Sequence, residues 1–164
     1  MEDVVRELGY LCLGSRLKRI SERLQADVNR LSERVGLDVQ AGQYPLLAAL
    51  DRNGPLTVGG LVGALGVSQP GVTRSVLRLV EMGLLEIERG DEDRRQKTVA
   101  LTEAGRRAVE TSKGEVWRHV EAAVVELCGD LSGSLLDQLN AMEDRLGQMS
   151  LDRRALRHKE RGGG

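Results

Sequence analysis

The sequence predicts a mainly helical fold with one small β-hairpin, and three observations carry that prediction. Aromatic residues make up 2% of the 164 residues and Phe is absent, so Leu, Val and Ala must form the core, which suits packed helices. Apolar residues recur at three- and four-residue steps along most of the chain, as in amphipathic helices. Residues 84–89 and 97–101 are instead short runs on either side of a polar turn, which predicts two paired strands.

The composition also bounds the setting in which the protein works. A net charge of −1 argues against indiscriminate coating of nucleic acid, although a basic surface confined to one face is compatible with DNA binding. No apolar run approaches the roughly 20 residues that span a bilayer, and no cleavable signal opens the chain. Cys12 and Cys128 lie far apart without metal-ligand spacing, as expected for reduced thiols. We therefore expect a cytoplasmic protein without a membrane interaction, a metal or a cofactor.

The first 36 residues predict one long amphipathic helix. Apolar side chains recur over residues 4–35, and Gly36 ends the pattern. Such a helix is too long for one small domain to cover, so part of its apolar stripe is expected to contact a partner chain. A second helix is expected at about 40–51, after which the sequence Asn-Gly-Pro at 53–55 breaks the chain.

Two short helices separated by a tight turn follow. Thr57 is a good N-cap for a helix that ends at Gly66. Ser68 is a good N-cap for the next helix, which has Pro70 in its first turn and ends near Gly83. The inward stripe of this second helix is expected to be Val72, Val76 and Leu79. The outward side chains are then Gln69, Thr73 and Arg74.

The last third of the chain predicts two more helices. Thr102 caps a helix that continues to about Cys128, and Ser132 caps another that runs to about residue 150. Residues 153–164 are basic and then glycine-only, and we expect them to fray.

A helix–turn–helix followed by a two-stranded hairpin is a winged helix, the geometry that places one helix in a DNA groove. At this point the sequence resembles the MarR family of bacterial transcriptional regulators, over about residues 4–150. The matching segments are Val67–Arg74 with Leu79 and Gly83–Leu85, Asp93–Arg95 with Val99–Gly105, and Gln43–Leu47. The second pair of segments corresponds to the D-x-R…L-T-x-x-G wing pattern of that family.

The resemblance implies a homodimer that binds double-stranded operator DNA. It divides the chain into an N-terminal dimerisation helix (1–36), a winged helix–turn–helix DNA-binding domain (37–105), C-terminal dimerisation helices (106–150) and a basic, Gly-rich tail (151–164). A two-fold protein of this kind reads a pseudo-palindrome whose half-sites lie ~10 bp apart. We expect a transcriptional regulator, acting as a repressor, that a small-molecule effector releases from DNA.

The resemblance places DNA contacts on the second short helix and on the wing. The helix residues are Ser68, Gln69, Thr73, Arg74 and Arg78. Arg74 suits guanine and Gln69 suits adenine, while phosphate contact is open for both. Arg78 has an alternative role as the ion-pair partner of a neighbouring acid.

In the wing, the resemblance implies that Arg95 enters the minor groove and that Asp93 orients it. Arg94 is the alternative residue for the same minor-groove contact. The alternative is that Asp93 and Arg95 form a solvated turn pair. The charge pattern favours DNA contact, because Arg74 and Arg78 are the only charged residues between Ser68 and Val80.

The resemblance also implies an effector pocket between the dimer base and the winged domain. Its conceivable lining residues are Tyr10, Arg16, Tyr44 and Trp117. Packing in the core or at an interface is the alternative role for each of them.

Two further functions remain open. A hydroperoxide-sensing branch of the family has a reactive cysteine near the position of Cys12, and some members add a second cysteine late in the chain. Oxidation of Cys12 to a sulfenic acid and an intersubunit disulfide with Cys128 would then release DNA, whereas a buried small residue is the competing interpretation. A helical protein–protein adaptor is the other alternative. No catalytic constellation can be assembled, so we do not expect an enzyme.

Overall fold

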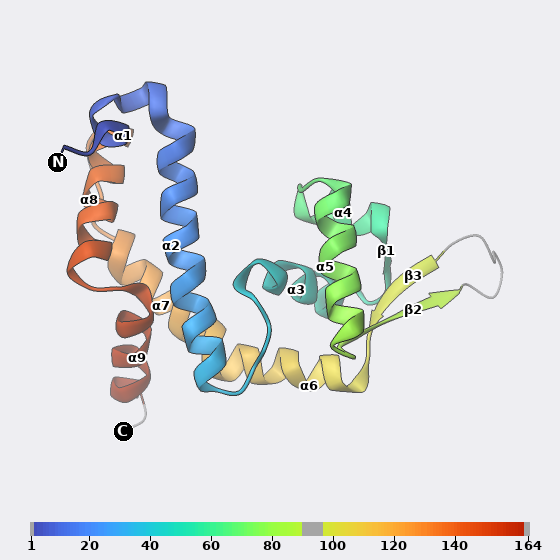
Figure 1. Ribbon diagram of the computed structural model, residues 1–164. Helices are drawn as coiled ribbons and strands as arrows, with labels where there is room; N and C mark the ends of the chain where they lie inside the picture. The colour runs from blue at the N-terminus through green and yellow to red at the C-terminus, as the bar shows by residue number, and fades with distance from the viewer. Residues whose placement is uncertain (1, 90–96, 163–164) are drawn as a thin grey trace. The chain divides into compact units, whose positions relative to one another are not determined.

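The computed structural model describes residues 2–89 and 97–162. It confirms a mainly helical chain with a small antiparallel sheet (Figure 1). The chain forms two compact units. The first combines residues 1–41 with 115–164, and the second is the contiguous stretch 42–114. Within the described residues, no helix is both long and apolar enough to cross a membrane.

The first unit is entirely helical where it is described. Its elements are α1 (Val4–Glu7), a 3₁₀ helix (Gly9–Cys12), α2 (Leu13–Arg34), α7 (Arg118–Cys128), α8 (Leu135–Gln148) and α9 (Leu151–Gly162). The prediction of one uninterrupted helix over the first 36 residues is wrong at its start. Gly9 adopts a φ of +54°, a left-handed conformation that glycine tolerates and that ends α1 before α2 begins.

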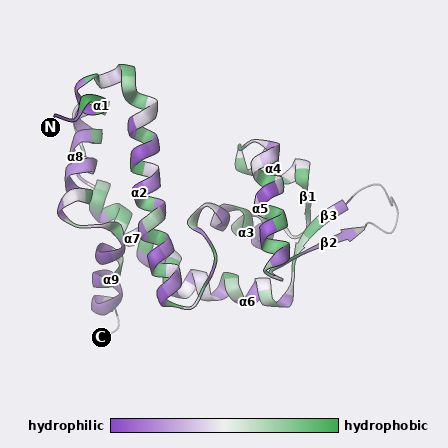
Figure 2. Ribbon diagram, in the orientation of Figure 1, coloured by the Kyte–Doolittle hydropathy of each residue, from purple (hydrophilic) through white to green (hydrophobic). Residues whose placement is uncertain are grey.

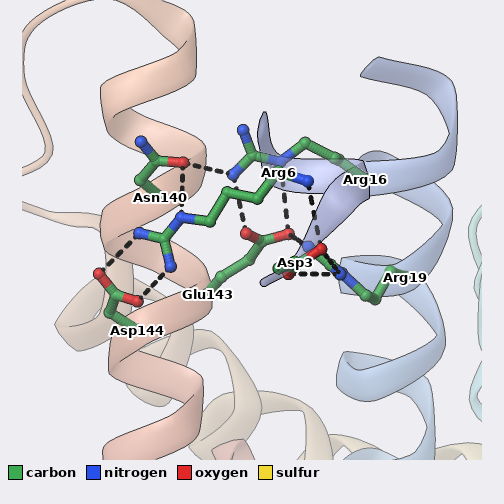
Figure 3. A network of polar contacts seen from close by, with 7 residues as sticks. All are labelled: Asp3, Arg6, Arg16, Arg19, Asn140, Glu143 and Asp144. Carbon is green, nitrogen blue, oxygen red and sulfur yellow. Dashed lines mark hydrogen bonds and ion pairs between the residues drawn. The ribbon is translucent and has the colours of Figure 1, made fainter. Parts of the chain in front are cut away.

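Ion pairs fasten the N-terminal segment and α2 to α8 (Figure 3). Arg16 Nη2 lies 2.8 Å from Glu143 Oε2, and both side chains are almost fully buried. Arg19 Nη2 lies 2.6 Å from Glu143 Oε1, so one carboxylate serves two guanidinium groups. At the surface, Arg6 pairs with Asp144, with 2.7 Å between Nη1 and Oδ1. The packing of α2 on α8 therefore includes a buried, charge-paired contact.

The C-terminal residues do not fray, which corrects our prediction for 153–164 over the part that is described. They belong to α9, which is almost wholly hydrophilic in Figure 2 and yet packs on α7 and α2. Leu151 and Ala155 are buried. Arg154 Nη1 lies 2.6 Å from a carboxylate oxygen of Glu126 in α7. The basic composition of these residues did not predict a packed helix, because the acidic partner of Arg154 lies on another helix, α7.

Two other helix boundaries differ from the sequence prediction. The helix α8 is capped by Ser134 rather than Ser132, in a capping box with Asp137. The helix expected from Thr102 to Cys128 is α6 (Glu103–Ser112) followed by α7, with a π-helix (Lys113–Trp117) between them. The end of this assembly at Cys128 is confirmed.

The second unit contains the short helices and the sheet. A 3₁₀ helix (Ala41–Gln43) begins one residue before this unit and leads into it. The elements that follow are α3 (Tyr44–Asn53), β1 (Leu56–Thr57), α4 (Val58–Leu65), α5 (Gln69–Glu81), β2 (Leu85–Arg89), β3 (Lys97–Leu101) and α6. The sheet has the order β1-β3-β2 and is antiparallel throughout. The predicted hairpin is confirmed, with Leu85 opposite Leu101 and Arg89 opposite Lys97.

The strand β1 is an addition that the sequence did not reveal. Leu56 pairs with Val99, and Thr57 pairs with Thr98. Thr57 also keeps its predicted role, because its Oγ1 accepts a hydrogen bond from the Gly60 amide at 3.0 Å. Thr57 therefore belongs to the edge strand β1 and also caps the N-terminus of α4.

A glycine sets the joint between the hairpin and α6. Thr102 caps α6 by accepting a hydrogen bond from the Gly105 amide at 3.0 Å, as predicted. The Thr102 amide donates to the carbonyl of Leu84 at 3.1 Å. A Cβ on Gly105 would lie 2.0 Å from that same carbonyl oxygen. No side chain fits there, so glycine allows α6 to pack directly on the start of the wing.

Candidate nucleic-acid interface

The helix α5 has one buried and one exposed face, as predicted. Its inward stripe is Val72, Val76 and Leu79, with 1%, 3% and 0% of their surface exposed. These residues pack against other parts of the second unit, including α4 and β2. The opposite face presents the exposed side chains Gln69, Thr73 and Arg74. The apolar pattern thus sets the rotation of α5, by burying one stripe and leaving the other to solvent.

A tight turn delivers the N-terminus of α5 to the surface. Gly66 ends α4 in the left-handed region with a φ of +64°, which an L side chain rarely adopts. Ser68 follows as the N-cap residue, and Pro70 lies in the first turn. The predicted side-chain cap is absent among the described contacts, because the Ser68 hydroxyl makes no capping hydrogen bond. That hydroxyl is exposed beside a helix N-terminus, where anions such as phosphates are favoured.

Side chains of the first two turns of α5 surround a shallow hollow. Its lining residues are Gln69, Pro70, Thr73 and Arg74. Pro70 was not among the predicted contacts, although its exposed position in the first turn places it on this face. The hollow therefore combines an amide, a hydroxyl and a guanidinium group with apolar surface.

The two arginines of α5 differ in their surroundings. Arg74 has no ion-pair partner among the described residues. Arg78 Nη1 lies 3.7 Å from Glu81 Oε2, with both side chains largely exposed. An exposed pair of this kind is weak and salt-sensitive. Arg78 thus has the ion-pair partner predicted as its alternative role, while no carboxylate of the described residues pairs with Arg74.

The wing residues singled out from the sequence lie outside the described part of the chain. These are Asp93, Arg94 and Arg95, within residues 90–96. The strands that flank them are described, and they end at the opposed residues Arg89 and Lys97. The sequence prediction for the wing arginines therefore remains a prediction.

The residues suggested for an effector pocket fall into different surroundings. Tyr10 is 61% exposed in the 3₁₀ helix, whereas Arg16 is buried against Glu143. Trp117 is half-buried in the π-helix, in the same unit. Tyr44 is buried at the start of α3, in the second unit. Within the first unit, Arg16 is held by α8 in an ion pair.

The electrostatics of Glu143 explain how firmly Arg16 is held. Burial on its own would raise the pKa of this carboxyl. Hydrogen bonds from Arg16 and Arg19 outweigh burial, so the pKa of Glu143 lies below its ordinary value. The Arg16 guanidinium is therefore paired with a carboxylate that stays ionised at neutral pH.

Both cysteines are free and half-buried, and neither forms a disulfide. Cys12 is the N-cap residue of α2, and Cys128 is the last residue of α7. Burial raises the pKa of the Cys128 thiol, although nearby Arg145 acts in the opposite direction. A raised pKa disfavours the reactive thiolate form.

Comparison with known proteins points to one family. Residues 35–96 match the family model described as the MarR family. The matched residues include α3, β1, α4, α5 and β2. The match covers much of the winged-helix unit and supports a MarR-family, winged-helix, DNA-binding transcriptional regulator. Among curated proteins, none matches the chain.

Solved structures of MarR and of other DNA-binding proteins are similar to most of this chain. A mutant of E. coli MarR, solved in complex with operator DNA, is 23% identical with a TM-score of 0.64, covering 90% of this chain and 98% of that one. The repressor CouR, bound to a 23-mer DNA duplex, is 26% identical with a TM-score of 0.61, covering 84% and 91%. BpsR of Bordetella bronchiseptica, whose DNA binding is regulated by 6-hydroxynicotinic acid, is 26% identical with a TM-score of 0.59, covering 84% and 91%.

Proposed function

We propose that this MarR-family protein is a homodimeric repressor that binds a pseudo-palindromic operator and leaves it when a small molecule binds. The observation that carries the proposal is the exposed face of α5. Its second turn presents Arg74, which has no ion-pair partner in the described part of the chain, beside Thr73, and no carboxylate lies on the helix before Glu81. A protein adaptor has no need for such an acid-free surface, whereas a phosphate-lined groove favours it.

The side chains of α5 suit different parts of a major groove. Arg74 can donate two hydrogen bonds to O6 and N7 of guanine, and Gln69 can pair with adenine. Ser68 and Thr73 carry hydroxyls suited to phosphate oxygens. In the same proposal Arg95 enters the minor groove, oriented by Asp93, with Arg94 as a second cation. Arg78 contributes less, because it is paired with Glu81.

An apolar groove on the first unit supports the homodimer. Its lining is Leu17, Ile20, Ser21, Leu24 and Gln25 of α2 with Leu139 and Met142 of α8, around about 370 Å³. The N-terminal segment adds the exposed side chains Val4, Leu8 and Leu11. Clustered apolar surface of this kind marks an interface. We propose that the same surface of a second copy covers it, which gives the two-fold axis that a pseudo-palindrome needs.

Relatives support the DNA and effector parts of the proposal. CouR is described as a transcriptional repressor bound to a DNA duplex, and BpsR is regulated by an aromatic acid. We propose by analogy that a small anionic or aromatic molecule releases this protein from its operator. Tyr44, Trp117 and Tyr10 stay candidates for binding this molecule. Arg16 can contact it only if the ion pair between Arg16 and Glu143 breaks.

Thiol sensing is a second proposal that the structure favours less. The raised pKa of Cys128 makes it a poor first target for peroxide. In this version Cys12 is oxidised first, and Cys128 of the partner copy then resolves the sulfenic acid to a disulfide.

The decisive experiment is selection of DNA by the full-length protein. The protein is incubated with random-sequence and genomic fragments, and the bound fragments are sequenced over several rounds. We expect a motif with two inverted half-sites whose centres lie ~10 bp apart. Sedimentation of the complex gives the number of chains bound to one duplex. An unchanged sequence distribution, or one chain per duplex, would overturn the proposal.

A further inference from the structure

One exposed side chain on α5 is apolar where a polar one would be expected. Leu77 is 51% exposed, although it lies on the helix proposed to enter the major groove. Seven residues earlier, Pro70 is also exposed. A spacing of seven residues, about two helical turns, places these two side chains on one stripe.

The stripe runs along the middle of the exposed face. With about 100° per residue, Leu77 lies between Gln69 and Thr73 on one side and Arg74 and Arg78 on the other. From Pro70 to Leu77 the stripe covers about 10 Å of the helix axis, or roughly three base-pair steps of 3.4 Å. Polar side chains thus flank an apolar ridge.

The chemistry of the major groove offers one apolar partner for such a ridge. Thymine is the base that presents a methyl group there, at C5, while the other base edges present hydrogen-bond donors and acceptors. A leucine side chain has no hydrogen bond to offer those edges. If it packs against a polar base edge, it removes water from donors and acceptors whose hydrogen bonds it cannot replace, and a methyl group avoids that cost.

We propose that Leu77 is a specificity-determining residue that packs on the C5-methyl group of a thymine in each operator half-site. Arg74 and Gln69 supply hydrogen bonds at the flanks of the ridge, and Leu77 supplies the selection for a methyl group between them. The inference rests on the proposed function, because it requires α5 to lie in the groove.

Deoxyuridine provides the test, since it pairs like thymidine and lacks only the methyl group. A duplex enriched by the selection above is prepared with each thymine of a half-site replaced in turn, symmetrically in both half-sites. We expect one position at which the affinity of the parent protein falls by about fourfold per half-site, the effect of one methyl group. The variants Leu77→Ala and Leu77→Gln should bind the thymidine and deoxyuridine duplexes equally well at that position.

A matched control separates this effect from the loss of any surface leucine. Leu135 lies in α8 of the other unit and is 45% exposed, so Leu135→Ala removes a comparable side chain. Because the readout is a ratio of two affinities of the same protein, Leu135→Ala should keep the ratio of the parent.

The outcomes distinguish this inference from the proposed function. If no duplex is enriched, the proposed function fails and the inference fails with it. If a duplex is enriched but the parent ignores every methyl deletion, or if Leu77→Ala keeps the parental ratio, the role of Leu77 alone is overturned. In that case Leu77 is a solvent-exposed surface residue.

Discussion

The backbone amide of Leu151 donates a hydrogen bond to Asp27 Oδ2 at 2.6 Å, so a residue of α2 caps the N-terminus of α9. Asp27 is buried, and it also pairs with Arg30 on its own helix. Arg30 in turn reaches Asp152, one residue beyond the capped amide. An acidic side chain at a helix N-terminus is favoured by the helix dipole. The start of the C-terminal helix is therefore set by a residue near the start of the chain.

Replacement of Asp27 by Ala should destabilise the protein. It leaves the Leu151 amide buried without its acceptor, which costs about 1–3 kcal/mol of unfolding free energy. Urea-induced unfolding followed by circular dichroism measures the change. Glu33→Ala, an exposed acid on the same helix, should change stability by less than about 0.5 kcal/mol. Equal effects of the two variants would contradict the capping role.

Replacement of Glu143 by Gln should cost more, and the cost should depend on pH. The change leaves Arg16 buried without its counter-charge, a loss of about 3–5 kcal/mol at pH 7. The pKa of Glu143 in the folded protein lies below its ordinary value of 4.5, so its stabilisation is fully present above that pH. It disappears as the pH falls through the lower folded value.

The measurement is denaturant unfolding of parent and Glu143→Gln from pH 7 down to pH 3. We expect the gap between the two proteins to narrow as the pH falls below 4.5, toward the lower pKa of folded Glu143. Asp144→Asn breaks the exposed pair with Arg6 and serves as the control, with an expected loss below about 1 kcal/mol. A gap that stays constant with pH would exclude ionised Glu143 as its source.

Two arginine variants should separate a base contact in the major groove from the contact of the wing in the minor groove. Arg74→Ala should weaken operator binding by about 1–3 kcal/mol and relax base preference at one position of each half-site. Arg95→Ala should weaken binding to all sequences alike and lower the slope of log K against log salt by about 1. Both variants should sediment as the parent does. If both bind operator like the parent at matched salt, the assignment of these contacts is wrong.

The thiol of Cys128 should react slowly. Its raised pKa lowers the thiolate fraction at neutral pH, so alkylation by iodoacetamide should lag behind that of a free cysteine peptide. Mass spectrometry of timed samples gives the rate at each cysteine.

For the sensing alternative, organic hydroperoxide should produce a cross-linked dimer on a non-reducing gel and reduced operator affinity. Unchanged mobility and affinity would remove that alternative.

Two glycine variants should move stability in opposite directions. Gly105→Ala places a methyl group against the Leu84 carbonyl, and the resulting backbone shift should cost about 1–3 kcal/mol. Gly63 lies in α4, where an added Cβ would meet open space, so Gly63→Ala should stabilise the protein by about 0.5–1 kcal/mol. Thermal unfolding of both variants tests the pair, and destabilisation by both would show that α4 needs its glycine.

The elements that sequence predicted well are those defined by local chemistry. Thr57 and Thr102 cap their helices because a side-chain oxygen three residues before an amide is a local arrangement. The inward stripe of α5 followed from helical period, because three apolar residues recur on one side. These features need no knowledge of the rest of the chain.

The features that sequence missed depend on contacts between distant residues. The helix α9 is held by Asp27 and Glu126, which lie far from it in the sequence. The two-residue strand β1 is too short for any periodicity and exists because Val99 offers it a partner. Likewise, nothing in the sequence near Arg16 indicates that its side chain is buried. The burial depends on the ion pair with Glu143, which lies on another helix. Long-range pairing of this kind leaves no local signal.

The division of the chain into units has a consequence for its synthesis. Residues 42–114 form the DNA-reading unit from one contiguous stretch, whereas the first unit needs both ends of the chain. The bond between Asp27 and Leu151 joins residues 124 positions apart, so it can form only after Leu151 has been synthesised. Because domains generally fold as their residues emerge, the reading unit can be complete first. A nascent chain thus carries its DNA-reading surface before it has finished the surface proposed to recognise a second copy.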